Sequence, residues 1–160
     1  MAQSACGDGS ALPPDRDAGS DALWETHWID AANTHLLDKV APGVFDRAID
    51  QELLAEYLAN DANWLCLALR EGLVVGMCMC VILTTPDKPR ELFLAEIGTG
   101  DDWRRQGIAQ TLMRMVFDRA DAENIEEIWL GTETDNHAAN GLYQTFKHER
   151  EDAVIYYFDW

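Results

Sequence analysis

The residues best suited to chemistry lie in a turn between an apolar run and an amphipathic segment. The turn contains Arg104 and Arg105, and the apolar periodicity after it predicts a helix over residues 107–122. The first turn of a helix carries unpaired N–H groups and the positive end of the helix dipole, so it attracts phosphate. Gly107 lets an anion approach the backbone because it has no Cβ. The turn therefore predicts a site for a phosphate or pyrophosphate group.

The elements around this turn are predicted from hydrophobic patterns and turn residues. We expect strands over residues 23–29, 64–69, 73–83, 91–99, 126–130 and 153–160, and helices over residues 30–39, 50–60, 107–122 and 137–146. This order predicts an α/β fold with a mixed sheet and helices on both of its faces. The phosphate turn and the acidic segment after residue 130 would then border one cleft.

The chain of 160 residues suits one domain. Residues 1–22 are small, polar and rich in Gly and Pro, and they predict a disordered leader. Residues 23–160 form the predicted single domain. The leader lacks the basic start and apolar core of a signal peptide, and no apolar stretch reaches the length of a membrane span. We therefore expect a cytoplasmic protein with no membrane partner.

The charge balance is strongly acidic. The chain has 29 Asp and Glu against 12 Lys and Arg, a formal net charge of -17. Such a surface repels nucleic acid, so we expect no nucleic-acid partner. It suits a small cationic amine as substrate, because an acidic cleft concentrates amines. The acids could equally serve solubility or adaptation to salt.

The chain has four cysteines, at positions 6, 66, 78 and 80. Three of them lie in apolar, strand-like segments without histidine partners or CxxC pairs. Cys78 and Cys80 would share one face of a strand. This context favours buried, reduced thiols over a zinc site or disulfides, and we expect no metal.

Two motifs resemble the signatures of the GNAT superfamily of acetyl-CoA-dependent N-acetyltransferases. The first, Arg/Gln-x-x-Gly-x-Gly/Ala, corresponds to Arg104, Arg105, Gln106, Gly107, Ile108 and Ala109. The second, an Asn followed by Ala-x-x-Leu-Tyr, corresponds to Asn136 and residues 139–143. The resemblance covers residues 24–160. It implies a GNAT-type mixed, mostly antiparallel central sheet with helices on both faces, and acetyl-CoA as cosubstrate.

Within the superfamily the chain resembles the aminoglycoside 3-N-acetyltransferases and their environmental relatives, on residues 86–89, 95–99 and 132–136 and on the acidic and aromatic chain end, residues 151–159. This resemblance implies acetyl transfer to a primary amine of an aminoglycoside, and hence antibiotic resistance. Lys147 and His148 stand where many members have Gly-Phe, so the resemblance does not predict the geometry of the last hairpin. Two alternatives remain: a protein or peptide N-acetyltransferase, and a non-catalytic acyl-CoA-binding module.

The resemblance assigns catalysis to Glu96 and Tyr143. Glu96 would remove the proton that makes an ammonium group non-nucleophilic, and partial burial would raise its proton affinity. Tyr143 would protonate the leaving thiolate of CoA, because phenol and thiol have similar proton affinities. The alternative for Glu96 is a structural acid or an ammonium binder. For Tyr143 it is an ordinary packed aromatic.

The resemblance also implies how the donor would be held. Backbone groups of Ile97 and Thr99 would pair with the pantetheine amides as an added strand, and Gly98 would allow the local distortion. Residues 104–109 would hold the pyrophosphate. Asn136 would bond the pantetheine chain or only cap its helix.

The acceptor side of the cleft would be formed by residues 30–39, the turn at residues 45–46 and residues 50–60. Acidic residues are expected to bind the acceptor. Glu133, Asp135 and Asp159, together with Glu96, would bind the ammonium groups of the substrate, although such acids are often simply solvated. An exposed strand and the Trp-rich ends of the chain would also allow a homodimer.

Overall fold

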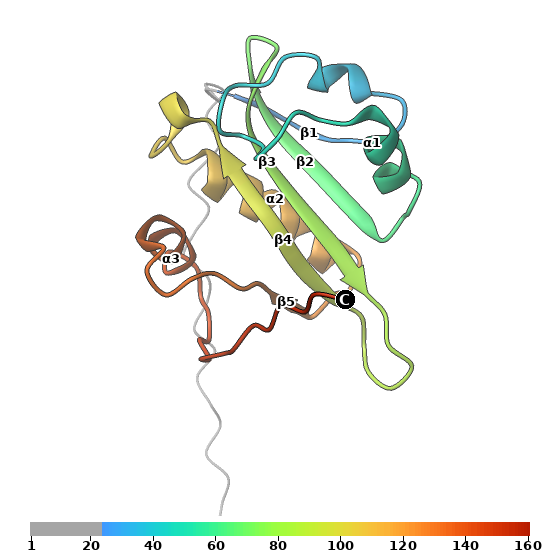
Figure 1. Cartoon of the computed structure of the whole chain (residues 1–160), viewed down its shortest axis with the longest axis vertical. Helices are drawn as coiled ribbons and strands as arrows, with labels where there is room; N and C mark the ends of the chain where they lie inside the picture. Colours follow the sequence, from blue (N-terminus) through green and yellow to red (C-terminus); the bar gives the residue numbers. More distant parts are fainter. Residues whose placement is uncertain (1–23) are drawn as a thin grey trace, which may run out of the picture.

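Figure 1 shows the computed structural model, which describes residues 24–160. The predicted leader, residues 1–22, lies outside the described residues. The described elements follow one another as β1 (Glu25–Trp28), the 3₁₀ helix η1 (Thr34–Leu37), α1 (Gln51–Leu58), β2 (Asn63–Arg70), β3 (Leu73–Leu83), β4 (Glu91–Thr99), the 3₁₀ helix η2 (Asp101–Trp103), α2 (Ile108–Ala122), β5 (Glu127–Trp129) and α3 (His137–Tyr143).

The five strands form one sheet in the order β1-β2-β3-β4-β5. Neighbours are antiparallel except for β4 and β5, which run parallel across the α2 connection. Glu71 and Gly72 both have positive φ angles, of 50° and 75°, as a two-residue hairpin turn between twisted strands requires. The predicted mixed, mostly antiparallel sheet is confirmed.

The sheet is covered on both faces (Figure 1). On one face, α2 packs through Leu112 and Val116 against Leu92 and Leu94 of β4. On the other face, a second apolar cluster joins α1, η1 and the loop after η1 to β2 and β3. Strands β2 and β3 are apolar along nearly their whole length because both of their faces are buried.

The helix predicted over residues 30–39 is replaced by the single 3₁₀ turn of η1. Side-chain hydrogen bonds hold its start in a non-helical turn: the Asp30 carboxylate accepts from the Ala32 N–H at 2.7 Å, and the Asn33 side chain accepts from the Asp30 N–H at 2.9 Å. Such Asp and Asn bonds compete with the helical pattern. In contrast, the Asp50 carboxylate caps α1, where it accepts from Glu52 and Leu53.

The strand predicted over residues 153–160 is wrong. These residues have no regular secondary structure, and all of them are exposed. The expectation rested on apolar residues alone, whereas a strand needs a neighbouring strand to pair with. Among the described residues the chain end has none.

Three cysteines, Cys66, Cys78 and Cys80, are buried and unpaired, and all three face α2 in one cluster. The shared face predicted for the last two is confirmed. Residues 24–160 hold no group of three or more His, Cys, Asp or Glu side chains arranged to bind a metal ion. None of the helices described is both long enough and apolar enough to cross a membrane.

Candidate active site

The candidate site lies in the opening between β4 and β5. The two strands pair only at residues 91–93 and 127–129. Beyond Phe93 the chain after β5 leaves β4 and runs to α3, so the β5 side of residues 94–99 has no neighbouring strand in the described chain. A cavity of about 1210 Å³ opens there, which is ample for a cofactor-sized ligand because such pockets usually measure about 300–1,000 Å³.

The closed end of this opening is fixed by Glu91. Its carboxylate is buried, forms an ion pair with Lys88, and accepts a hydrogen bond from the Trp129 indole N–H at 3.2 Å. The Trp129 ring also lies 4.6 Å from that of Phe93. These contacts hold β5 against the start of β4, so the two strands separate toward the C-terminal end of β4.

Most of the predicted site residues line this cavity. They are Glu96, Ile97, Gly98, Thr99, Arg104, Arg105, Gly107, Ile108, Ala109, Glu133, Asn136 and Tyr143. Three predicted residues do not line it: the Gln106 side-chain amide instead donates to the Asp102 carbonyl at 3.3 Å, Asp135 is exposed in the turn before α3, and Asp159 is exposed near the chain end.

The predicted phosphate turn is shaped as an anion cradle. Gly107 is the N-cap of α2 and has a left-handed φ of 83°, a conformation that glycine adopts without strain. Arg105 also has a positive φ, of 59°. Successive N–H groups in such turns form concave anion sites, and the first N–H groups of α2 have no partner within the helix. The Arg104 guanidinium is held by Asp101 at 2.7 Å.

The N-terminus of α2 comes close to the sheet because of Gly76 on β3. A Cβ at this position would lie 2.5 Å from the Ile108 side chain. Ile108 is the first residue of α2 and is buried. The small residue on β3 therefore sets the cradle directly beside the end of β4.

A β-bulge in β4 determines which face carries Glu96. Glu96 lies opposite Met79, whereas Leu94 lies opposite Cys80, so Ala95 is an extra residue in β4. In an uninterrupted strand Glu96 would share the buried α2 face with Leu94, because side chains alternate. The bulge instead turns Glu96 to the opposite face, beside the loop of residues 38–50, which we call the acceptor-side loop.

That loop carries Asp46, which lines the cavity. The sequence placed the turn at residues 45–46 on the acceptor side but assigned Asp46 no role of its own. Burial raises the pKa of Glu96, and the nearby negative charge of Asp46 raises it further. The loop is docked on β4 by Gly98: a Cβ there would lie 2.1 Å from the Val44 carbonyl oxygen. The glycine thus serves close packing, while the strand distortion lies at Ala95.

Helix α3 forms the wall opposite β4 and presents Tyr143. Burial, and to a smaller extent the neighbouring Cys78, raise the pKa of the Tyr143 hydroxyl, so it stays protonated at neutral pH. Asn136 caps α3 by accepting from the Ala139 N–H at 3.1 Å, and it also lines the cavity. Gln110 ties this wall to α2 through its hydrogen bond to Thr145, at 3.2 Å.

The charged side chains that line the cavity come from separate elements. The two basic side chains, Arg104 and Arg105, lie at the α2 end, while Asp46, Glu96 and Glu133 are its acidic side chains. The guanidinium groups suit a phosphate-bearing ligand, and the carboxylates suit a cation.

The chain belongs to the GNAT acetyltransferase family, whose family model matches residues 24–147. It is therefore an acyltransferase, with acetyl-CoA as cosubstrate. No curated protein matches the chain significantly.

Solved structures with the same fold include several acetyltransferases. An aminoglycoside acetyltransferase, meta-AAC0020, from an uncultured soil metagenomic sample in complex with sisomicin has a TM-score of 0.74 and 18% identity, covering 88% of this chain and 98% of that chain. The aminoglycoside acetyltransferase AAC(6')-Iy with a bisubstrate analog has a TM-score of 0.67 and 20% identity, covering 85% and 97%. A transcriptional regulator from Bacillus halodurans has a TM-score of 0.64 and 19% identity, covering 83% and 100%.

Proposed function

We propose that this chain transfers the acetyl group of acetyl-CoA to a primary amine of a small multi-cationic substrate, with aminoglycosides as the substrate class. The observation that carries the proposal is that one cavity is lined both by the arginines before α2 and by the carboxylates of Asp46, Glu96 and Glu133. The family supplies the donor, and the acidic lining supplies the preference for amines.

The residues present fit the donor. The cradle at Gly107 and the guanidinium groups of Arg104 and Arg105 offer N–H donors and positive charge to the diphosphate. The β5 side of residues 94–99 offers backbone groups to the amides of the pantetheine arm, in the manner of an added strand. Bound there, acetyl-CoA supplies an activated acetyl group.

Two side chains manage the protons. The Glu96 carboxylate takes the proton of the incoming ammonium, directly or through a water molecule, and its raised pKa makes it a stronger base. The Tyr143 hydroxyl, held protonated by burial, gives its proton to the departing sulfur. Asn136 both caps α3 and contacts the donor.

The acceptor lies against the carboxylates. Asp46 and Glu133, which line the same cavity as Glu96, bind further ammonium groups of the substrate. A substrate with several amines satisfies all three carboxylates, whereas a monoamine leaves two of them without a cation. Two fold neighbours carry such ligands by name: sisomicin in one, and a CoA-linked neamine analog in the other.

A release assay for CoA thiol, run over aminoglycosides, polyamines and basic peptides, tests the proposal. We expect kcat/KM to be highest for multi-amine sugars. A clear preference for peptide α-amines or lysines would instead support a protein N-acetyltransferase. Acetyl-CoA binding with no turnover on any amine would support a non-catalytic module, a reading favoured by the neighbour described as a transcriptional regulator.

Product analysis by NMR addresses the position of transfer. The sequence resemblance predicts the 3-amino group, whereas the neighbour AAC(6')-Iy is named for the 6′ position. Acetylation at either position fits the multi-amine proposal and would imply antibiotic resistance. We also propose a cytoplasmic location, which agrees with the free thiols of Cys66, Cys78 and Cys80.

A further inference from the structure

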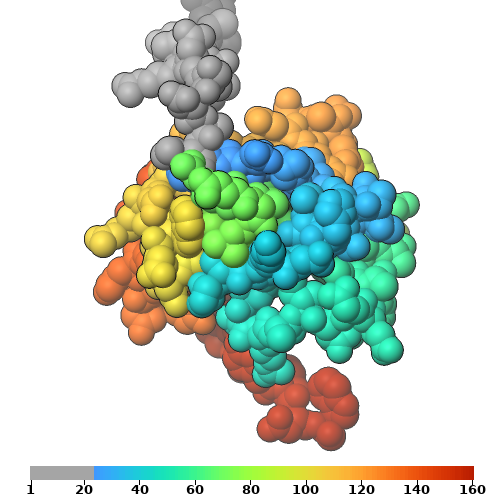
Figure 2. Space-filling model, turned by 90° about the horizontal axis from the view of Figure 1, so that it is seen from above, coloured from blue at the N-terminus to red at the C-terminus, as the bar shows by residue number. Residues whose placement is uncertain are grey.

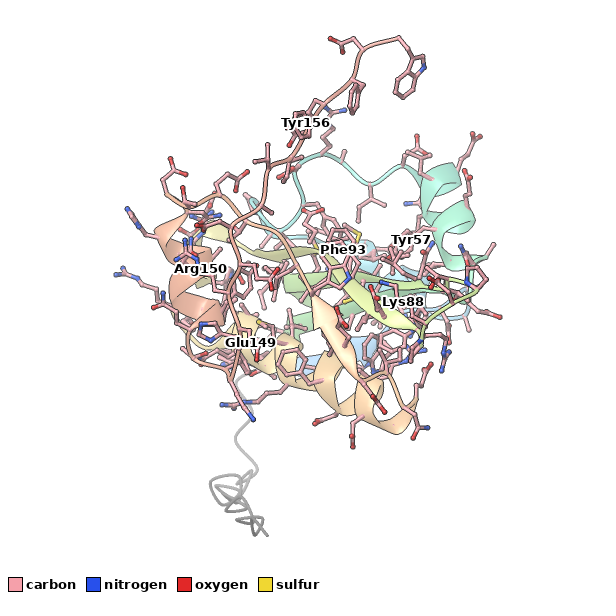
Figure 3. All side chains as sticks on the ribbon, turned by 90° about the horizontal axis from the view of Figure 1, so that it is seen from below. Tyr57, Lys88, Phe93, Glu149, Arg150 and Tyr156 are labelled. Atoms are coloured by element: carbon pink, nitrogen blue, oxygen red, sulfur yellow. The ribbon has the colours of Figure 1, made fainter. Side chains whose placement is uncertain are left out.

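The chain between β5 and α3 lines the cavity without regular secondary structure. We call residues 130–136 the connecting segment; it contributes Gly131, Thr132, Glu133 and Asn136 to the lining. Figure 2 shows α3, in orange, on the same side of the molecule as the yellow turn of residues 100–107, and Figure 3 shows α3 apart from the strand that carries Phe93. The position of the Glu133 carboxylate therefore depends on what ties this segment to α3.

Asn140 on α3 makes that connection. Its side-chain amide donates to the Glu133 carbonyl at 3.0 Å and to the Asn136 carbonyl at 2.8 Å. An amide nitrogen carries two hydrogens, so both bonds form at once. The Glu133 carbonyl also accepts from the Asn136 N–H, at 3.1 Å. Three hydrogen bonds therefore close the turn of residues 133–136, and two of them come from this one side chain.

Asparagine is a poor choice for the helix itself. It is a weaker helix former than Leu or Ala, because its side chain competes for backbone groups, and α3 has only seven residues. An Asn140 side chain that merely faced solvent would thus weaken α3 without a return. Its bond to Glu133 instead reaches seven residues back, outside the helix. The amide therefore serves the connecting segment.

We propose that Asn140 is a positioning residue for acceptor recognition, because it fixes the backbone that carries the Glu133 carboxylate in the cavity. The inference rests on the proposed function, in which Glu133 binds an ammonium group of a multi-amine substrate. Asn140 is not among the residues that line the cavity. It acts through Glu133 and does not contact the reacting atoms.

The proton donor on the same helix has support of its own. Leu142 and Tyr143 pack against the apolar cluster beneath α2. Loss of the Asn140 bonds should therefore free Glu133 and leave Tyr143 in place. A carboxylate that samples many positions binds an ammonium group less tightly, because fixing it then costs conformational entropy. The effect belongs in the KM for the acceptor and not in kcat.

Amide hydrogen exchange, followed by NMR on the free protein, tests whether Asn140 holds the segment. In Asn140→Leu, the Asn136 amide should exchange at least about 5-fold faster, the factor that corresponds to one average hydrogen bond. Gln144→Leu is the matched control: it also removes a side-chain amide, just after α3, where the side chain is exposed and makes no hydrogen bond within residues 24–160. Unchanged exchange at Asn136 in Asn140→Leu would overturn the proposal, whatever the substrate.

Steady-state kinetics with acetyl-CoA and sisomicin, the ligand of one fold neighbour, test the effect on the acceptor. Asn140→Leu and Asn140→Ala should each raise KM for sisomicin about 5- to 10-fold, with kcat within about 2-fold of the wild type. In a Glu133→Gln background the same changes should have almost no further effect, because the group that they position is already lost.

An equal rise in KM in the Glu133→Gln background, or a fall in kcat alone, would count against a role through Glu133. If the wild-type protein acetylates no amine, the proposed function fails, whereas the exchange rate of the Asn136 amide still decides whether Asn140 holds the connecting segment. Circular dichroism and thermal unfolding check that each variant folds. Since Leu and Ala both favour a helix, neither change should unfold α3.

Discussion

The Val44 carbonyl oxygen rests on the Cα of Gly98, so closely that a Cβ there would lie 2.1 Å away. This contact joins the acceptor-side loop, which carries Asp46, to the strand that carries Glu96. The spacing of the two carboxylates therefore depends on a glycine that takes no part in the chemistry.

We expect Gly98→Ala to lower the free energy of unfolding by about 1–3 kcal/mol, as overpacking does. Urea denaturation measures the change. Gly141→Ala is the control, since a Cβ there meets nothing within 4 Å on α3; it should raise stability by about 0.5–1 kcal/mol. Equal stability of Gly98→Ala and the wild type would show that the loop at Val44 moves away from β4 without a cost in free energy.

Glu96→Gln should lower kcat by about 10²-fold or more, because the neutral amide cannot accept the proton.

Asp46→Asn removes a charge that raises the pKa of Glu96, so this pKa falls. The acidic limb of the profile of kcat/KM against pH should then move to lower pH. Asp118→Asn, on the exposed side of α2, should leave the limb in place. If Asp46→Asn left the acidic limb in place, the charge of Asp46 would have no influence on the pKa of Glu96.

Tyr143→Phe should lower kcat by about 10²-fold while the affinity for acetyl-CoA stays unchanged, because only the proton donor is lost. Since burial raises the pKa of Tyr143, the wild-type enzyme should keep its activity on the alkaline side until the pH passes the ordinary tyrosine range. Tyr157→Phe, in the exposed segment of residues 153–160, is the matched control. Unchanged turnover in Tyr143→Phe would assign the ring to packing.

Arg105→Ala should raise KM for acetyl-CoA about 10-fold or more, since a hydrogen bond to a charged group contributes about 1.5–3 kcal/mol. The same variant should leave KM unchanged for acetyl-pantetheine, which lacks the diphosphate. Arg114→Ala, on α2 but outside the cavity lining, should affect neither donor. Equal losses on both donors would mean that Arg105 supports the turn and does not bind the diphosphate.

The mixed sheet and the α2 helix follow from local patterns in the sequence, whereas most of the predicted cavity lining follows from the resemblance of two motifs to a known family. β3 and β4 have the predicted bounds, because long apolar runs between turn residues define them. The cradle was predictable because a glycine before an amphipathic helix already implies free N–H groups.

The face of Glu96 was not predictable in this way. Alternation alone would bury it with Leu94, and the inserted Ala95 becomes visible only in the pairing of β4 with β3. The contribution of Asp46 depends on a contact between segments far apart in the sequence. Residues 153–160 were predicted as a strand from composition, but pairing depends on what lies beside them.

The buried cysteines affect how activity can be measured. Hydrogen bonds with the Cys66 and Cys80 thiols, together with burial, raise the pKa of Cys78, so this thiol stays protonated and out of reach of aqueous reagents. With Cys6 changed to serine, a colorimetric thiol reagent would report only released CoA while the protein is folded. The same reagent would register unfolding as a second, slower gain in colour.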